Sequence, residues 1–398
     1  MRYARPSPAG RFFEAAMTNP APPSRLRFDR NEWAGAFGDL GTDIPLLVGM
    51  TLAARLDGAS VLMVFGAMQI LTALVYRMPM PVQPLKAMAA LVIAQRLGGD
   101  ILFGAGLAIG VVMLVLTLTG ALDWLARLVP KCVVRGIQFG LGLQLATIAL
   151  GNYVRANGAA GYALAAMAFV LTLLLIGNRK YPAALVVIAL GLAFALLNKF
   201  ETGIFTASFG FGWPKLHVPG WGDVLTGFLV LAVPQIPLSI GNSVLATRQV
   251  AADFFPERPL SIRRIGLTYS LMNLLAPWFS GVPVCHGSGG MAGHYSFGAR
   301  TGGSVLIYGL FLVLLGIFFG AGFEKVVQIF PLPILGVLLL FEALALVKLL
   351  ADQVNEVSAF TISLLVGLCA AGLPYGYAIG VFVGTVLYYL RRRGSDLR

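Results

Sequence analysis

The sequence contains few charged residues. Asp, Glu, Lys and Arg make up 12% of its 398 residues, whereas about 25% is usual in a soluble domain. Hydrophobic residues make up 58%, and the mean hydropathy is +0.83. Apolar runs long enough to span a bilayer recur along nearly the whole chain. This composition excludes a soluble globular protein and predicts an all-α integral membrane protein in contact with the lipid bilayer.

Cysteine and histidine are also scarce, with three residues of each. The cysteines (Cys132, Cys285 and Cys369) lie in or beside apolar runs, which excludes a disulfide framework. No group of ligand residues predicts a metal site, and no nucleotide-binding loop is present. We therefore expect no cofactor, and any ATP-driven process would need another subunit.

The apolar runs divide into two sets of seven. The third run of each set is too short to cross a bilayer, so we expect a half-helix there. The fold class that follows is two inverted seven-span repeats, over 31–200 and 221–393, with fourteen transmembrane segments. The expected spans are 34–54, 59–76, 84–97, 101–120, 131–152, 159–177 and 181–199, then 223–245, 262–279, 285–298, 303–321, 326–349, 357–372 and 374–391.

The distribution of basic residues predicts the orientation. The net charge of +12 comes mostly from segments that lie on one side, and we place these inside the cell. Both termini are then cytoplasmic, residues 1–30 form a disordered tail, and no soluble regulatory domain follows Arg393. We expect the inner (cell) membrane as the location and no binding to nucleic acid, since no basic soluble face exists. Outside remain Arg55, Arg96, Arg155, Lys199, Lys215 and Lys325.

A short motif occurs in both halves. Pro81-Val82 and Pro283-Val284 each precede a few polar or glycine residues and then a short apolar stretch. A second pair, Asp43-Ile44-Pro45-Leu46 and Gln235-Ile236-Pro237-Leu238, keeps nearly the same spacing. Interrupted helices at matching positions in two halves indicate the substrate site of a transporter. We expect the two half-helices to meet in the middle of the membrane.

The second half-helix begins in a segment rich in glycine. Amide groups at a helix start bind anions, and glycine lets a ligand approach the backbone. Close packing between helices is the other interpretation of these glycines. The predicted substrate-binding residues here are Cys285, His286, Gly287, Ser288 and Gly289.

The first half-helix offers Gln83 and Lys86, an amide donor and a buried positive charge that suit an oxyanion. Thr42 lies between Asp39 and Asp43 in the first span. These carboxylates either transfer protons, coordinate Na⁺ or neutralise Lys86, and a purely structural salt bridge is the alternative.

Ser239 and Asn242, one helical turn apart in the eighth span, either line the cavity or join helices. The sequence pattern assigns no role to His294.

Three segments resemble signatures of the molybdate transporter family, which is related to the sulfate permeases. They are Gly38-Asp39-Leu40-Gly41-Thr42, Pro81-Val82-Gln83-Pro84-Leu85-Lys86, and Cys285 to Gly293 with its continuation Phe297-Gly298-Ala299-Arg300-Thr301-Gly302. The resemblance implies a core domain that moves against a gate domain, with the substrate between the two half-helix starts. The sequence departs from the family pattern at Asp43 and His294.

We therefore expect a secondary active transporter of a tetrahedral oxyanion, with molybdate first and sulfate or tungstate as alternatives. A proton-coupled nucleobase permease on the same fold would need acidic residues that the eighth and tenth spans lack. An intramembrane enzyme using Cys285 and His286 is disfavoured because adjacent helical side chains do not face each other, so we predict no catalysis. The candidates for coupling are Asp39, Asp43 and His286, and the sequence leaves a homodimer open.

Overall fold

The described part of the chain folds into helices, with one small β-sheet at the centre. The computed structural model describes residues 25–175, 183–199, 209–373 and 376–395. The first half contains α2 (Arg30–Ala36), α3 (Leu40–Ala54), α4 (Gly58–Tyr76), β1 (Val82–Pro84), α5 (Lys86–Gln95), α6 (Gly99–Leu118), α7 (Ala121–Leu128), α8 (Lys131–Ile148), η1 (Ala149–Tyr153), α9 (Gly158–Leu175) and α10 (Ala183–Lys199).

The second half repeats this order. It contains α12 (Trp221–Gly227), η2 (Phe228–Ala232), α13 (Val233–Leu238), η3 (Ser239–Ala246), α14 (Thr247–Phe254), α15 (Ile262–Leu275), η4 (Ala276–Phe279), β2 (Val284–His286), α16 (Ser288–Ser296), α17 (Gly303–Ile329), α18 (Leu332–Lys348), η5 (Leu349–Gln353), α19 (Val357–Gly372) and α20 (Gly376–Ser395).

Seven helices in the described part are long and apolar enough to cross a membrane. They are Gly58–Tyr76, Gly99–Leu118, Lys131–Tyr153, Gly158–Leu175, Trp221–Phe254, Gly303–Gly320 and Leu332–Gln353. The helical membrane fold agrees with the sequence analysis, while the count of fourteen spans stays a prediction. One predicted boundary differs, because α17 continues to Ile329 and α18 begins only after Pro331, a residue suited to a helix start.

Helices at corresponding positions along the two halves make equivalent contacts. Helix α4 packs along α17, and its counterpart α15 packs along α6. Helices α8 and α19 pair in the same way as α18 and α9. Gly66 of α4 and Gly309 of α17 allow these two helices to pack closely, since a Cβ at either would come within 2.7 Å of the other's carbonyl oxygen.

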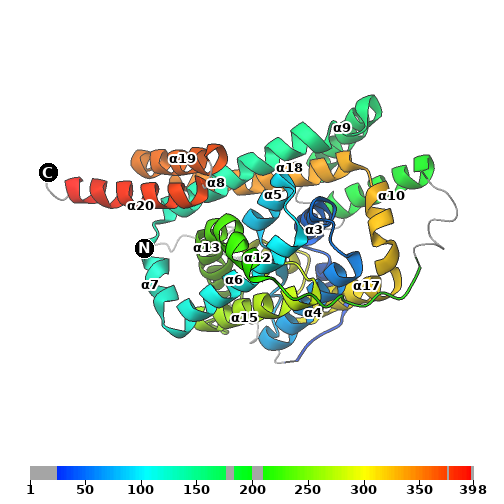
Figure 1. Ribbon diagram of the computed structural model, residues 1–398, viewed down its shortest axis with the longest axis horizontal. Helices are drawn as coiled ribbons and strands as arrows, with labels where there is room; N and C mark the ends of the chain where they lie inside the picture. Colours follow the sequence, from blue (N-terminus) through cyan, green and yellow to red (C-terminus); the bar gives the residue numbers. More distant parts are fainter. Residues whose placement is uncertain (1–24, 176–182, 200–208, 374–375, 396–398) are drawn as a thin grey trace, which may run out of the picture.

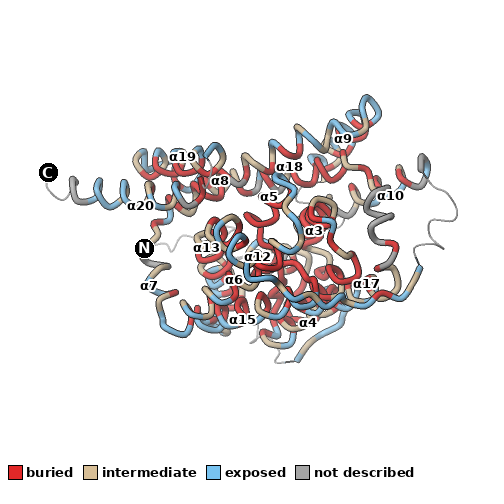
Figure 2. The backbone as a smooth tube through the Cα atoms, viewed as in Figure 1, coloured by how far each residue is buried: buried red, intermediate tan, exposed pale blue. Residues whose placement is uncertain are grey.

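Two groups of helices lie side by side in Figure 1. Helices α8, α9, α18, α19 and α20 form one side, and α4, α6, α12, α15 and α17 form the other, with α3 and α5 between them. Figure 2 shows the buried backbone concentrated around α3 and α4, whereas much of α9 and α20 is exposed. Exposed apolar side chains on these outer helices suit contact with lipid.

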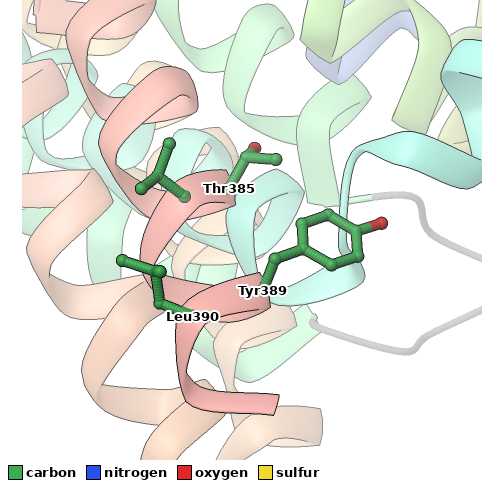
Figure 3. A pocket seen from close by; sticks show the side chains of 4 residues that line it. Thr385, Tyr389 and Leu390 are labelled. Carbon is green, nitrogen blue, oxygen red and sulfur yellow. The ribbon is translucent and has the colours of Figure 1, made fainter. Parts of the chain in front are cut away.

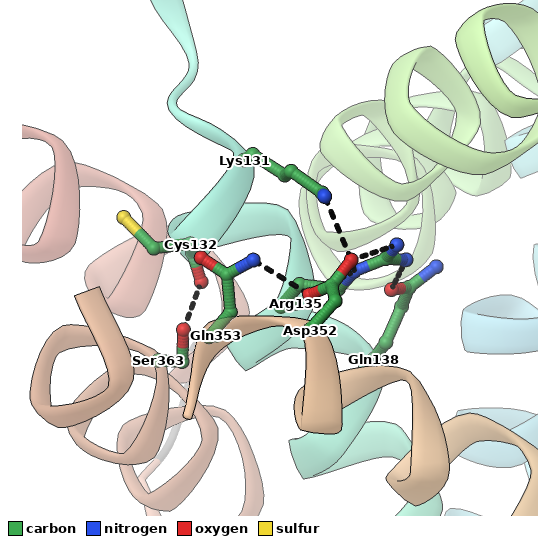
Figure 4. A network of polar contacts seen from close by, with 7 residues as sticks. All are labelled: Lys131, Cys132, Arg135, Gln138, Asp352, Gln353 and Ser363. Atoms are coloured by element: carbon green, nitrogen blue, oxygen red, sulfur yellow. Dashed lines mark hydrogen bonds and ion pairs between the residues drawn. The ribbon is translucent and has the colours of Figure 1, made fainter. Parts of the chain in front are cut away.

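A polar network joins α8 to η5 within the first group (Figure 4). Asp352 accepts hydrogen bonds from Arg135 and lies 2.8 Å from the Lys131 ammonium. The Ser363 hydroxyl donates to the Cys132 carbonyl at 2.7 Å, which adds α19 to the same contact. These bonds hold three helices of this group together at one end.

The small sheet brings the two repeated motifs together. Strands β1 and β2 are antiparallel, and Gln83 pairs with Cys285 at the centre. Since antiparallel strands run in opposite directions, α5 and α16 leave the sheet in opposite directions, and both begin beside it. The Pro81 and Pro283 carbonyls accept matching bonds from the Gly287 and Leu85 amides, at 3.4 and 3.1 Å.

Each strand is held on its outer edge by a side-chain carboxamide. Gln69 of α4 bonds the Val82 backbone at both its amide and carbonyl, at 2.8 and 2.7 Å. Asn273 of α15 bonds Val284 in the same way, at 2.9 and 2.7 Å. Two carboxamides therefore satisfy backbone groups that a two-stranded sheet leaves unpaired.

Only the end of the expected disordered tail, residues 25–30, belongs to the described part of the chain. There the Arg27 amide donates to Thr301 at 3.1 Å and Asp29 caps α2, although all of residues 25–30 except Leu26 are exposed. Residues 1–24 lie outside the described residues.

Candidate functional site

Helix α16 begins beside an open space in an otherwise buried segment. Residues 281–287 are all buried, but Ser288 is half-buried and Gly289 is exposed. A methyl group at Gly289 would meet no atom within 4 Å. A helix start with room beside it presents amide N–H groups and a favourable dipole to an anion.

Ser288 is joined to the long helix between 221 and 254. Its hydroxyl donates to Asn242 Oδ1 at 3.3 Å, and Asn242 lies in the π-helical segment η3. Such segments are frequent at functional sites because they shift side chains away from regular helical positions. The structure thus brings together two of the predicted site residues.

The side-chain amide of Gln83 is hydrogen-bonded to Asp39. Its Nε2 donates to both carboxylate oxygens of Asp39, at 2.7 and 2.8 Å, and both side chains are buried. Asp39 lies in the break between α2 and α3, and its carboxylate fills the space where Gly290 lacks a side chain. Gln83 therefore places a carboxylate beside the first turn of α16.

The start of α5 differs from that of α16. Lys86 is its first residue and is 7% exposed. The next two amides, of Ala87 and Met88, donate to Gln235 Oε1 at 2.9 and 3.3 Å. Gln235 in turn donates to Ser239, whose hydroxyl lies 2.7 Å from that of Tyr269. Ser239 thus belongs to a buried network that caps α5.

The charged groups of the two motifs gather around the sheet. Lys86, Asp39 and Asp43 all lie close enough to the buried Cys285 thiol to interact with it electrostatically. Thr42, on the same helical turn as Asp43, is half-buried. One positive and two negative side chains therefore act on the same thiol at the centre of the sheet.

His286 points away from this group. Its Nε2 lies 2.6 Å from the Thr268 hydroxyl, and its ring packs edge-on against Tyr76 at 5.3 Å. Neighbouring residues of a strand point to opposite faces, which separates the His286 side chain from that of Cys285. The structure does not bring His286 together with the other predicted site residues.

Sequence analysis missed three residues that support the site. Gln69 and Asn273 hold the strands, and the Tyr308 hydroxyl of α17 donates to Asp43 at 3.1 Å. A signal existed for the first two, since each is a lone carboxamide in an apolar span that precedes a Pro-Val motif. Tyr308 lies far from the motifs in sequence, and no pattern pointed to it.

A surface pocket on α20 is separate from this site (Figure 3). Thr385, Val386, Tyr389 and Leu390 line it, and all four belong to α20, which carries none of the predicted site residues.

Comparison with known proteins shows the family of the chain. Residues 31–145 and 227–346 match the family described as "Molybdate transporter of MFS superfamily". The chain is 36% identical to Molybdate transporter 2 of Arabidopsis thaliana, over 90% of this chain and 87% of that protein. The chain belongs to the molybdate transporter family. Molybdate transporter 1 of Chlamydomonas reinhardtii is 27% identical over 89% of this chain and 90% of its own length.

Solved structures show the fold of this family member. The transmembrane domain of the cyanobacterial bicarbonate transporter BicA is similar with a TM-score of 0.64 at 17% identity, over 87% of this chain and 99% of that one. Murine Slc26a9, an anion transporter in the inward-facing state, is similar with a TM-score of 0.69 at 13% identity, over 99% of this chain and 77% of that one. The chain is therefore an integral membrane protein that shares the fold of these two transporters.

Proposed function

We propose that this protein is a secondary active transporter of molybdate. The observation that carries the proposal is the open space beside Gly289, at the start of a short helix in a member of the molybdate transporter family. Its relatives are named transporters, which favours transport over catalysis.

The substrate site lies at the start of α16. Backbone amides of Ser288 and Gly289 and the Lys86 ammonium supply donors and positive charge for a tetrahedral dianion. Asn242 accepts the Ser288 hydroxyl proton and so holds the first residue of α16 against η3, and Gln83 fixes the position of the Asp39 carboxylate. Sulfate and tungstate present the same oxygen geometry and are competing substrates of this site.

The helix group of α3 to α6 and α12 to α17 is the core, and that of α8 to α10 and α18 to α20 is the gate. Alternating access follows if the gate moves against the core around a fixed site. The division in Figure 1 supports this assignment, because α8, α9, α18, α19 and α20 lie together on one side of the core helices. We place the protein in the cell membrane with both termini in the cytoplasm.

A binding titration of the purified protein tests the substrate. Molybdate and tungstate should bind, sulfate should compete, and uracil should not bind. Lys86→Ala should raise the Kd for molybdate about ten- to a hundredfold, since a charge-assisted bond contributes roughly 1.5–3 kcal/mol. Lys215→Ala, on the surface, is the control. Binding of uracil alone, or equal molybdate affinity in Lys86→Ala, would contradict the proposal.

A further inference from the structure

Three titratable side chains lie in a row in the core, beginning at the site. Asp43 of α3, Tyr308 of α17 and His294 of α16 are each 0% exposed. Tyr308 donates to Asp43 Oδ2 at 3.1 Å, and the His294 ring packs edge-on against Tyr308, with ring centroids 6.4 Å apart. Tyr308 therefore lies between a carboxylate and an imidazole.

His294 has one nitrogen bonded and one free. Nδ1 lies 3.1 Å from the Ser304 hydroxyl, while the buried Nε2 has no hydrogen-bond partner among the described residues. A buried polar atom without a partner is unfavourable, so a purely structural role would be better served by an apolar side chain. The free nitrogen instead suits a group that gains and loses a proton.

The charges around this row come from four elements. Asp39, like Asp43, interacts electrostatically with Tyr308, and Lys86 interacts with the Cys285 thiol, as both carboxylates do. On the side of His294 lies Glu32 of α2, which accepts the Ser304 amide at 2.9 Å. The Arg300 guanidinium is directed elsewhere, since it lies 3.6 Å over the Tyr295 ring and bonds the Tyr295 carbonyl.

The carboxylates at the site make dianion binding unfavourable. With Asp39 and Asp43 ionised, Lys86 balances only one of the two negative charges. Adding a dianion within a low-dielectric core would then place three net negative charges in one region. A proton gained at the same time removes part of this repulsion.

We propose that Asp43 and His294, on the two sides of Tyr308, bind one proton together with the oxyanion. The proton comes from solvent, is held on the Asp43 carboxylate or on His294 Nε2, and leaves when the anion leaves. Tyr308 keeps its own hydroxyl proton throughout. This assignment rests on the proposed function, since it needs an oxyanion at the start of α16.

Calorimetric titration with molybdate tests the inference. The purified protein is titrated near neutral pH in two buffers of different ionisation enthalpy, which gives the number of protons gained per anion bound. We expect about one proton, and a Kd that rises about tenfold per pH unit between the proton's pKa in the free protein and its higher pKa in the complex. His294→Gln and Asp43→Asn should each reduce the uptake to less than about half the parent value.

His217→Gln is the matched control, because this histidine lies 3.7 Å from Asp100 and is remote from the row in sequence and helix. It should gain as many protons as the parent. Molybdate binding by the parent without proton uptake would overturn the inference and leave the proposed function intact. Absence of binding to molybdate, tungstate and sulfate would contradict both. Unchanged uptake in folded His294→Gln and Asp43→Asn would also overturn the inference.

Discussion

Two neighbouring glycines at the start of α16 differ in what a side chain would meet. A Cβ at Gly289 would enter open space, whereas one at Gly290 would collide with the Asp39 carboxylate and come within 2.7 Å of Pro81. The two positions therefore separate the role of the open space from the packing of the fold.

We predict that Gly289→Ala folds at least as stably as the parent, because alanine favours a helix over glycine by about 1 kcal/mol. It should nevertheless weaken molybdate binding, since its methyl group occupies the space beside the amides. Gly290→Ala should lower the unfolding temperature by displacing Asp39. Thermal unfolding and a binding titration of both variants check this. Gly289→Val adds more bulk at the same position. If this variant bound molybdate as tightly as the parent, the substrate site would lie elsewhere.

At the scale of elements, the sheet depends on the two carboxamides that hold its strands. Replacing Gln69 or Asn273 by Ala leaves one buried N–H and one buried C=O of a valine unpaired. Each variant should lose roughly 2–4 kcal/mol of unfolding free energy. Denaturant unfolding in detergent measures the loss, with Gln249→Ala on α14 as an exposed control. A loss no larger than that of the control would show that the strands do not need these bonds.

The start of α4 provides a pH-dependent contribution to stability. Asp57 caps this helix through Ser60 and lies 2.6 Å from the Lys215 ammonium. Burial raises the pKa of Asp57, but hydrogen bonds from Lys215 and Ser60 outweigh this effect and hold it below 3.8. A lowered pKa stabilises the fold above the unfolded value, and this stability is lost as pH falls through the folded pKa.

We therefore expect Asp57→Ala to cost about 1 kcal/mol at neutral pH and progressively less below pH ~4. Unfolding of parent and variant across this pH range tests the prediction. A difference in stability that stays constant with pH would exclude the carboxylate as its source.

The sequence predicted the parts of the fold that depend on local pattern. Short helices after the Pro-Val pairs are visible in it, because hydrophobic run length and helix-breaking residues act locally. The pairing of Gln83 with Cys285, the carboxamide supports and the orientation of His286 depend on contacts across the two halves. A sequence pattern does not encode which face a strand residue takes when both faces are buried. His286 and Gln83 show this, since their types suited a ligand but one faces α15 and the other holds Asp39.

At the scale of the whole molecule, the two helix groups meet where α3 packs on α18. Val48 and Leu335 are buried against each other there. We predict that a disulfide between Val48→Cys and Leu335→Cys abolishes transport while molybdate still binds, and that reductant restores transport. The parent treated with the same oxidant controls for its own cysteines. Transport that survives complete cross-linking would contradict motion of the gate against the core.

The central claim is that this protein carries molybdate through the start of α16, and uptake into liposomes tests it most directly. Purified parent protein should accumulate molybdate in sealed vesicles, tungstate and sulfate should compete, and Gly289→Val should fold but show no uptake. Vesicles with parent protein that take up no more molybdate than empty vesicles, or equal uptake with Gly289→Val, would contradict the account.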